Sequence, residues 1–286
     1  MGLELAAQSP EACALIDLAG QACGVDVWRL LRSGGSDWNR TEVIQPLLVA
    51  VCLGVWHELG RAGVVARAVA GHSLGEICAC CAAGCLDPPA AVSLAAARGR
   101  LMAREAAAHP GGMIALLDAD EQRAAAAARA AGGSVTVAGC NGPGQWVLSG
   151  ALPALRSVAA SYPSRWLAAA GAWHSEAMVG AVDELRDALE GCMGAPTRAR
   201  LVCAGTGQVV TRAEQVVDHL ARQLVRPFRW DVAHDTLRDL GIEQLVAVGP
   251  AKVVRALARR NLGAAVTIHA AERPADLARL VEQVGQ

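Results

Sequence analysis

The sequence has little charge and no excess of either sign. Of its 286 residues, 19% are charged, and 26 Lys and Arg stand against 27 Asp and Glu, for a formal net charge of -1. A protein that binds polyanions usually has a clear excess of Lys and Arg, and a protein with an acidic tail has an excess of Asp and Glu. We therefore expect no nucleic-acid partner. The 53% of hydrophobic residues excludes a disordered chain, because that much apolar surface can offset the entropy lost on folding.

Long hydrophobic runs and an export signal are also lacking. The two longest apolar stretches, residues 47–56 and 77–86, are about ten residues each, while crossing a bilayer core of roughly 30 Å takes about 20. The opening MGLELAAQSP has neither the basic start nor the apolar block of a signal peptide. We expect a soluble, cytoplasmic protein that binds no membrane.

Cysteine is abundant, with ten residues, but loop-borne CxxC pairs and His-rich partners are missing. Cys78, Cys81 and Cys85 fall on one face of an Ala-rich segment that is predicted to form a buried helix, and Cys80 lies beside them. In a reducing compartment, free cysteines pack as small apolar side chains. We predict core packing, with neither disulfides nor a metal site.

Residues 1–110 are predicted to form the first part of a large domain. Its elements are a helix over 47–59 that starts near Thr41 with Gln45-Pro46, a strand over 64–70, and helices over 74–83 and 89–107. The breaker cluster His109-Pro110-Gly111-Gly112 then marks a boundary.

Residues 111–170 have a different rhythm, of short strands and short helices. The predicted elements are strands over 113–118, 134–138, 145–149 and 165–168, with helices over 121–131 and 152–160. The order βαββαβ is that of a ferredoxin-like unit, so we expect a small inserted subdomain.

Residues 171–286 resume the alternation of helix and strand and complete the large domain. Helices are predicted over 176–190, 213–224, 232–240, 253–260 and 275–284, and buried parallel strands over 201–204, 244–248 and 265–268. The expected fold is an α/β sheet domain interrupted by the small one.

The sharpest local motif is Gly71-His72-Ser73-Leu74-Gly75-Glu76, a GxSxG between a predicted strand and a predicted helix. Its glycines permit a strained turn that exposes Ser73, and the helix behind it directs backbone N–H groups at a developing oxyanion. The alternative is a Gly/Ser turn that only closes a βα unit. The context favours a nucleophilic Ser73.

A serine nucleophile needs a base, and histidine suits neutral pH. His57, His219 and His234 lie in predicted helices beside charged residues and are most simply surface or partly packed side chains, His109 lies in the linker, and His269 follows a strand. His72 adjoins Ser73, but the sharp turn points it away. His174 stands where the chain returns from the small subdomain to the large one, which makes it a candidate base.

Several ordered segments resemble one enzyme family. NRTEVIQP, VAGHSLGE and LAAARGRLM between Asn39 and Met102, then NGPGQWVLSG, AWHSEAM and VGPAKV further along, are similar to segments of malonyl-CoA:acyl carrier protein transacylases and polyketide synthase acyltransferase domains. The resemblance covers nearly the whole chain. It implies an α/β-hydrolase-like large domain with an inserted ferredoxin-like subdomain.

The resemblance also implies residue roles. Ser73 becomes the nucleophile, and His174 the base, which a backbone carbonyl orients in place of an Asp. Arg98 corresponds to the arginine that binds the free carboxylate of a malonyl group, a task that suits the two parallel donors of a guanidinium. Without the family, Arg98 would be taken for a solvated helix residue. The other substrate-binding candidates are Gln45 in the acyl pocket, Leu74 with its oxyanion-hole N–H, His72 and Trp173.

The chain departs from the family pattern in three ways. No GQG turn, whose glutamine N–H is the second oxyanion donor in the family, occurs in the printed sequence. We therefore expect a form extended upstream with such a strand and turn to be more stable and more active. Trp173 replaces a common Phe and is expected to narrow the pocket near the acyl α-carbon. Ala251 replaces a glycine that often follows Gly249-Pro250.

The function that we expect is transfer of malonyl from malonyl-CoA to the phosphopantetheine thiol of an acyl carrier protein, through acyl-Ser73, in polyketide or fatty acid synthesis. No cofactor is required, the partners are the coenzyme A thioester and the carrier protein, and the chain is expected to be a monomer. The alternatives are an acyl hydrolase on the same scaffold and a docking subunit without catalysis.

Overall fold

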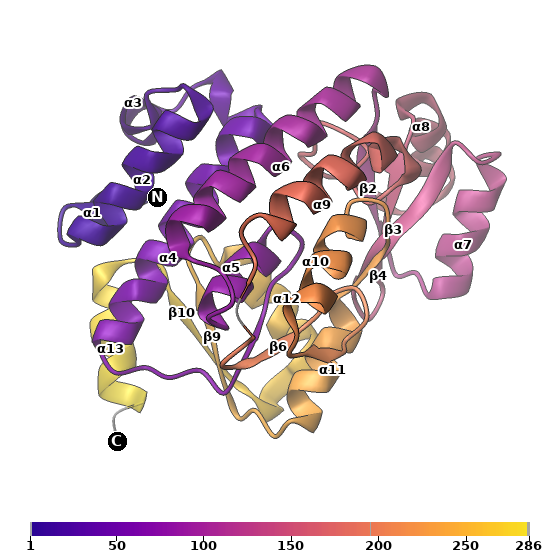
Figure 1. Ribbon diagram of the computed structural model, residues 1–286. Helices are drawn as coiled ribbons and strands as arrows, with labels where there is room; N and C mark the ends of the chain where they lie inside the picture. The colour runs from indigo at the N-terminus through magenta and orange to yellow at the C-terminus, as the bar shows by residue number, and fades with distance from the viewer. Residues whose placement is uncertain (1, 195, 285–286) are drawn as a thin grey trace.

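A computed structural model describes residues 2–194 and 196–284 and shows a mixed α/β protein (Figure 1). Its α-helices are α1 (Leu3–Ala6), α2 (Pro10–Cys23), α3 (Val27–Ser33), α4 (Thr41–Arg61), α5 (Gly75–Ala82), α6 (Pro88–Ala108), α7 (Glu121–Ala130), α8 (Leu152–Ser161), α9 (Val182–Glu190), α10 (Ala213–Arg222), α11 (Trp230–Asp239), α12 (Lys252–Leu262) and α13 (Pro274–Val284). Short 3-10 helices are η1 (Ser36–Asn39), η2 (Glu176–Ala181) and η3 (Gly263–Ala265).

Within residues 2–194 and 196–284, ten short strands form three sheets. They are β1 (Ala68–Ala70), β2 (Gly112–Leu117), β3 (Val135–Gly142), β4 (Gln145–Gly150), β5 (Ser164–Trp166), β6 (Arg200–Val202), β7 (Val209–Val210), β8 (Phe228–Arg229), β9 (Gln244–Val248) and β10 (Thr267–Ala271). The orders are β1-β6-β7, β10-β9 and β5-β2-β4-β3-β8. β1 pairs with β6, β9 with β10 and β3 with β8 in parallel, and the other pairs are antiparallel.

The five-stranded sheet carries α7 and α8 on one face, where Figure 1 shows them at the right of the molecule. β3 and β4 form a hairpin, and β5 closes the edge beside β2. Buried side chains such as Ile114, Leu148 and Leu155 fill the space between this sheet and the two helices. β8 extends the sheet with a strand from the last third of the chain and so joins it to the elements around α10 and α11.

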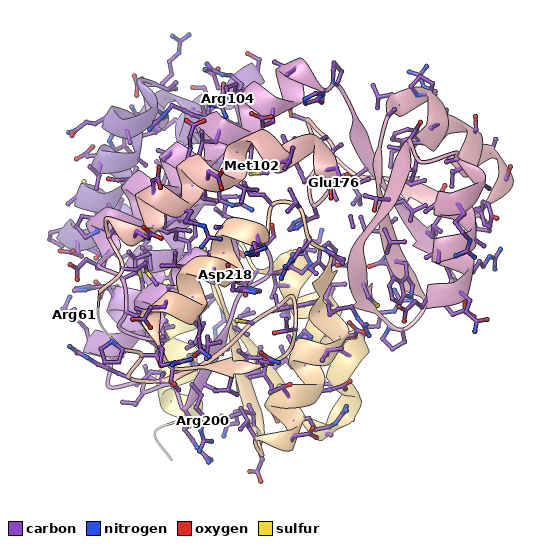
Figure 2. The ribbon with its side chains drawn as sticks, turned by 45° about the vertical axis from the view of Figure 1, so that its right-hand side comes forward. Arg61, Met102, Arg104, Glu176, Arg200 and Asp218 are labelled. Carbon is purple, nitrogen blue, oxygen red and sulfur yellow. The ribbon has the colours of Figure 1, made fainter. Side chains whose placement is uncertain are left out.

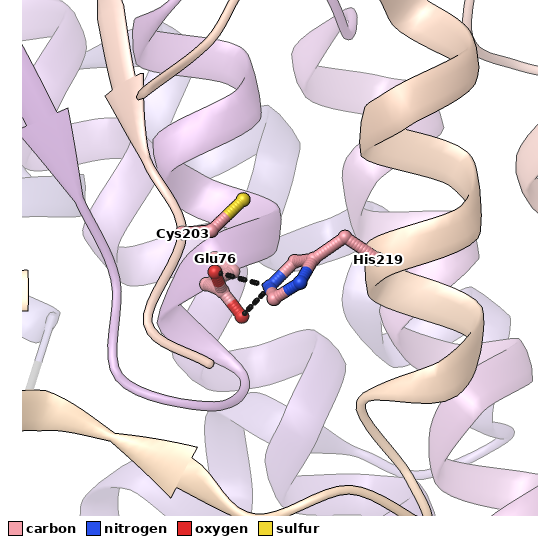
Figure 3. Close-up of side chains that lie close together, drawn as sticks. All are labelled: Glu76, Cys203 and His219. Atoms are coloured by element: carbon pink, nitrogen blue, oxygen red, sulfur yellow. Dashed lines mark hydrogen bonds and ion pairs between the residues drawn. The ribbon is translucent and has the colours of Figure 1, made fainter. Parts of the chain in front are cut away.

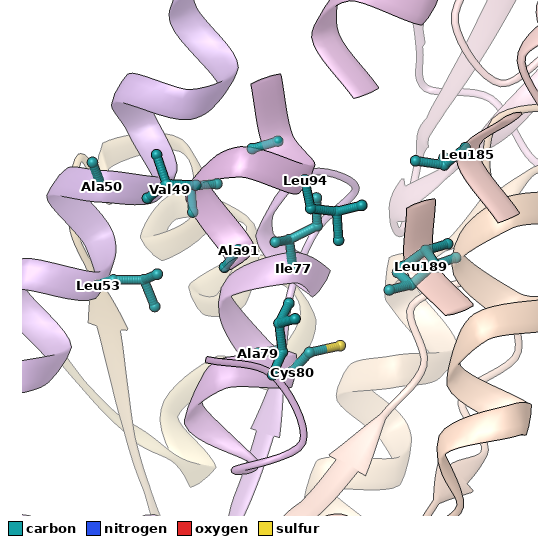
Figure 4. Packing of buried hydrophobic residues seen from close by; sticks show 14 of the residues in the cluster. Val49, Ala50, Leu53, Ile77, Ala79, Cys80, Ala91, Leu94, Leu185 and Leu189 are labelled. Carbon is teal, nitrogen blue, oxygen red and sulfur yellow. The ribbon is translucent and has the colours of Figure 1, made fainter. Parts of the chain in front are cut away.

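The largest core cluster surrounds α5. Figure 4 shows side chains of α4, α5, α6 and α9 in this cluster, among them Leu53, Ile77, Leu94 and Leu189. Each of these four is at most 3% exposed. Because the motif turn lies directly before α5, this packing fixes the position of the turn relative to α6 and α9.

The expectation that no apolar segment is long enough to cross a membrane is corrected by helix α4. It has 21 residues, and its most apolar window has a mean hydropathy of 1.5. Of that window, 61% is buried, and α4 packs against α2 and α6. An all-round apolar helix in contact with neighbouring helices is typical of a protein core.

Several predicted elements need correction. The strand expected over 64–70 comprises only residues 68–70, and the helix expected over 176–190 is divided into η2 and α9. The strands expected to share one parallel sheet lie in two separate sheets. Cys85 lies beyond the end of α5 instead of on its face, although it is buried. The N-terminal helices α1 to α3, with β7 and β8, were not predicted.

Candidate active site

The motif turn places Ser73 between the end of β1 and the start of α5. Ser73 has a φ of 50°, in the left-handed region that L residues seldom adopt. Gly71 permits the tight turn, because a Cβ at this position would lie 2.0 Å from the carbonyl carbon of Gly75. A serine with a strained backbone, on a sharp turn between a strand and a helix, is the structure that the GxSxG pattern predicts.

His174 lies against Ser73. The distance between Ser73 Oγ and His174 Nε2 is 2.9 Å, and His174 itself has a φ of 58°. Its Nδ1 donates to the backbone oxygen of Gln223 at 2.8 Å and lies 3.3 Å from that of Arg226. Because two carbonyl oxygens require a proton on Nδ1, Nε2 is the acceptor for the Ser73 hydroxyl.

Burial is the main reason why the pKa of His174 falls to about 3, and the charge of Arg98 acts in the same direction. His174 is 5% exposed. The imidazole is therefore neutral near pH 7 and able to take the proton of Ser73. The geometry and the protonation state together make this pair a candidate nucleophile and base.

Arg98 lies on α6 and points its guanidinium at Ser73. The side chain is 4% exposed, and Nη2 is 3.3 Å from Ser73 Oγ. Its remaining hydrogen bonds in the described part of the chain go to Gln45 Oε1 at 2.6 Å and Gln223 Oε1 at 2.9 Å, which are both neutral. Buried charges are normally paired, so a buried cation held by two amides next to a nucleophile is suited to a ligand carboxylate.

Gln45 orients Arg98. It is 4% exposed, and while Oε1 accepts from Arg98, Nε2 donates to Thr41 Oγ1 at 2.6 Å and lies 3.3 Å from the sulfur of Met102. Thr41 and Gln45 are one turn apart at the start of α4, and Met102 lies one turn after Arg98 on α6, where Figure 2 labels it. The glutamine therefore fixes the guanidinium between α4 and α6, and its role in lining an acyl pocket stays a prediction.

Leu74 directly follows Ser73, at the N-terminal end of α5. In the described residues no oxygen accepts a hydrogen bond from its backbone N–H, whereas the N–H groups of Gly75 and Glu76 donate to His72 and Ser73 carbonyls. A free N–H beside a nucleophile, at a helix start, suits the developing oxyanion. The predicted role of Leu74 as an oxyanion donor is compatible with this placement.

His72 and Trp173 flank the site. His72 Nε2 lies 3.0 Å from Asn141 Oδ1, and its ring packs against Phe228 and Trp230. Burial lowers the pKa of His72. Trp173 is half-buried and contacts two core clusters, and its ring fills the space that Gly171 leaves free. Direct substrate contact by either residue stays a prediction.

Sequence patterns missed two buried residues that complete the site. Gln223, at the end of α10, holds His174 through its backbone oxygen and Arg98 through its side chain. Glu76, in the first turn of α5, accepts a hydrogen bond from the Gln223 side chain. Glu76 belongs to the quoted GHSLGE segment, but Gln223 stands in a segment without a recognisable motif.

His234, expected at the surface or partly packed, is 1% exposed.

The pH profile of acylation tests the state of His174. With a pKa of about 3, the base stays neutral down to mildly acidic pH, so kcat/KM for acylation of the free enzyme is expected to change less than about twofold between pH 7.5 and 5.5. A histidine with the ordinary pKa of about 6.5 would lose about tenfold over the same interval. Stopped-flow acylation, with circular dichroism as the control for folding, separates the two profiles.

The comparisons with known proteins are consistent with this geometry. The family model described as "Acyl transferase domain" matches residues 1–273. The malonyl CoA-acyl carrier protein transacylase of Mycobacterium tuberculosis is 37% identical over 96% of this chain and 92% of the relative. The crystal structure of the transacylase from that organism has a TM-score of 0.88 at 36% identity, and covers 96% of this chain and 92% of the relative.

A further structural neighbour is a complex. It contains the malonyl-transacylase PlMCAT and AntF, a type II polyketide synthase acyl carrier protein. Its TM-score is 0.88 at 28% identity, and the match covers 99% of this chain and 94% of that chain. In that structure, therefore, a chain of similar fold is bound to a carrier protein.

Proposed function

This chain belongs to the acyl transferase domain family, and we propose that it moves a malonyl group from malonyl-CoA to the phosphopantetheine thiol of an acyl carrier protein, with Ser73 as the carrier of the acyl group. The observation that carries the proposal for this chain is the position of Arg98. A buried guanidinium 3.3 Å from the nucleophilic oxygen is placed to bind an acyl group with a free carboxylate.

In the first half-reaction, His174 Nε2 takes the proton of Ser73 as Oγ attacks the thioester carbonyl. The Leu74 N–H donates to the oxyanion, and the two carbonyls on Nδ1 stabilise the imidazolium. When the tetrahedral intermediate collapses, the C–S bond breaks and His174 gives its proton to the coenzyme A thiolate. The product is a malonyl ester on Ser73.

The second half-reaction uses the same groups in reverse. His174 takes the proton of the phosphopantetheine thiol, and the thiolate attacks the ester carbonyl. Collapse breaks the bond to Ser73 Oγ, which regains a proton from His174. The cycle needs no redox step and no metal, so we propose that it runs without a cofactor. We also propose that the chain is cytoplasmic and acts as a monomer.

The fold that we propose is an α/β-hydrolase-like large domain, residues 1–110 and 171–286, with a ferredoxin-like subdomain at residues 111–170. The order β5-β2-β4-β3, with β2 and β4 in the centre, supports the subdomain assignment. The parallel pairs β1 with β6 and β9 with β10 support a sheet of α/β type in the large part.

A single-turnover partition experiment tests transfer against hydrolysis. The malonyl enzyme is formed with radiolabelled malonyl-CoA, freed of donor, and mixed with holo acyl carrier protein or with buffer. Transfer predicts label on the carrier protein and slow release in buffer. Rapid release of free malonate with or without the carrier would instead identify a hydrolase, and absence of any acyl enzyme would favour a docking subunit.

The Trp173 side chain tests the predicted limit on the acyl α-carbon. Trp173→Phe is expected to raise kcat/KM for methylmalonyl-CoA relative to malonyl-CoA by about 10-fold, because the room for one methyl group in an apolar pocket is worth roughly 1–3 kcal/mol. Competition between the two donors measures the ratio. Trp56→Phe, in the remote cluster with Leu59, is the matched control. An unchanged ratio would mean that Trp173 faces the core instead of the pocket.

A further inference from the structure

The side-chain amide of Gln223 lies at the centre of the site and has all its polar atoms engaged. Oε1 accepts from Arg98 Nη2 at 2.9 Å, and Nε2 donates to the Ser73 backbone oxygen at 3.1 Å and to Glu76 Oε2. The backbone oxygen of the same residue accepts from His174 Nδ1 at 2.8 Å. One residue thus contacts the base, the nucleophile segment and the cation.

The orientation of that amide depends on its neighbours. A half-turn of the amide plane would place Oε1 against Glu76 and Nε2 against Arg98, which would oppose acceptor to acceptor and donor to donor. An ionised carboxylate accepts hydrogen bonds and donates none. The charge of Glu76 therefore selects the amide orientation in which Gln223 Nε2 faces Glu76 and Gln223 Oε1 faces Arg98. The orientation of the guanidinium therefore depends on Gln45 and, through Gln223, on the buried carboxylate of Glu76.

Glu76 is itself held by a partner of opposite charge. It is 2% exposed, and His219 Nε2 on α10 lies 2.8 Å and 3.0 Å from its two oxygens, while the Ala204 N–H donates to Oε1 at 2.8 Å. Figure 3 shows His219 directed at the carboxylate, with Cys203 beside them. Burial alone would lower the pKa of His219, but hydrogen bonds with Cys203 and Glu76 and the charge of Glu76 raise it to about 10.

Glu76, Cys203 and His219 are also side chains that can ligate a metal, and their ligand atoms lie within 4.8 Å of one another. The carboxylate, however, already accepts from the Gln223 side chain, the Ala204 N–H and His219. Nε2 of His219, at 2.8 Å and 3.0 Å from the two carboxylate oxygens, is itself engaged by them. The hydrogen bonds favour an ion pair over a metal site.

We propose that Glu76 and His219 form a buried ion pair that acts as a positioning unit for the reaction: it fixes the Gln223 amide, and through this amide the orientation of Arg98 and hence the preference for a malonyl donor. The proposal rests on the function proposed above. In the described residues, neither side chain forms a hydrogen bond with Ser73 Oγ or with Arg98. His174 is held by the backbone oxygen of Gln223, whereas Arg98 is held by its side chain. The orientation of the Gln223 side chain is therefore expected to affect the choice of acyl donor more than the basicity of His174.

The test compares malonyl-CoA and acetyl-CoA as donors on the same preparation of each variant. Glu76→Gln keeps the size and an acceptor but removes the charge that selects the amide orientation. We expect the ratio of kcat/KM for malonyl over acetyl to fall by about tenfold or more, since a misplacement of about 1 Å in a positioning group can cost about 100-fold. The change should appear mainly as a higher KM for malonyl-CoA. His219→Gln should lower the ratio in the same direction and by less, because the carboxylate remains.

The control is Glu105→Gln, which removes another buried carboxylate. Glu105 is 8% exposed and pairs with Arg104 on α6, the arginine labelled in Figure 2. Loss of folded protein lowers both donor rates equally and cancels in the ratio, so a purely structural effect leaves the ratio unchanged. If Glu76→Gln does not fold, His219→Gln, at a more exposed side chain, provides the same readout.

The outcomes are distinct. A lower ratio in the Glu76 and His219 variants, and not in the Glu105 variant, supports the proposal. An unchanged ratio in folded Glu76→Gln would overturn it, as would a wild-type melting temperature that rises with equimolar Zn²⁺ and falls again with a chelator, because a metal would then hold the three side chains. A wild-type chain that forms no malonyl enzyme would instead contradict the proposed function.

Discussion

Ser73→Ala is expected to abolish the acyl enzyme, and His174→Ala to slow its formation at least about 1,000-fold. The two side chains act as one unit across a distance of 2.9 Å, and a serine hydroxyl without a base is a poor nucleophile at neutral pH. Stopped-flow acylation with malonyl-CoA, followed by intact mass, measures both effects. His57→Ala removes an exposed histidine of α4 and serves as the control.

The His174 variant is the more specific test of the mechanism, because loss of Ser73 would abolish any reaction that depends on this serine. Acylation at the wild-type rate without His174 would contradict its role as base. A second acceptor for the Ser73 proton would then be required, and among the described residues the Arg98 side chain, the other group within hydrogen-bond distance of Oγ, has only donors to offer.

Arg98→Ala is expected to invert the donor preference from malonyl-CoA towards acetyl-CoA. Without the guanidinium, the malonyl carboxylate would lose its water in a buried site and find only amide groups. Loss of a charged, hydrogen-bonded partner costs about 2–5 kcal/mol, so kcat/KM for malonyl-CoA should fall at least about tenfold. Acetyl-CoA carries no carboxylate and should lose little.

The matched control is Arg100→Ala, two residues along the same helix. Arg100 is exposed, and its guanidinium donates to the backbone oxygen of Ala22. This variant should keep the wild-type donor ratio. If Arg98→Ala also keeps it, the carboxylate is bound by another group, and the observation that carries the proposed function is lost.

Sequence patterns specified the motif turn and the long helices better than the sheets. The GxSxG turn could be predicted because glycine is required where a Cβ would collide with the backbone of Gly75. Long amphipathic or apolar helices such as α4 and α6 also have clear periodicity. The parallel strands were harder, because runs of three to five apolar residues specify neither their partners nor the sheet in which they lie.

Arg98, Gln223 and Glu76 show why the rest of the site could not be derived from local patterns. Arg98 stands in an ordinary helical segment, and only the family resemblance singled it out. Gln223 and Glu76 are 147 residues apart and meet through the packing of α10 against the motif turn. Side chains that act through long-range hydrogen bonds leave no periodic signal, so their roles appear only when the fold is known.

The most direct test of the central claim is the intact mass of the chain after incubation with malonyl-CoA, followed by peptide mapping and by addition of holo acyl carrier protein. The account predicts a gain of one malonyl group, located on Ser73, and its complete disappearance in favour of malonyl carrier protein. Parallel incubations with acetyl-CoA and methylmalonyl-CoA should give less adduct. A malonyl group on any other residue, or an ester on Ser73 that the carrier protein does not remove, would contradict the account.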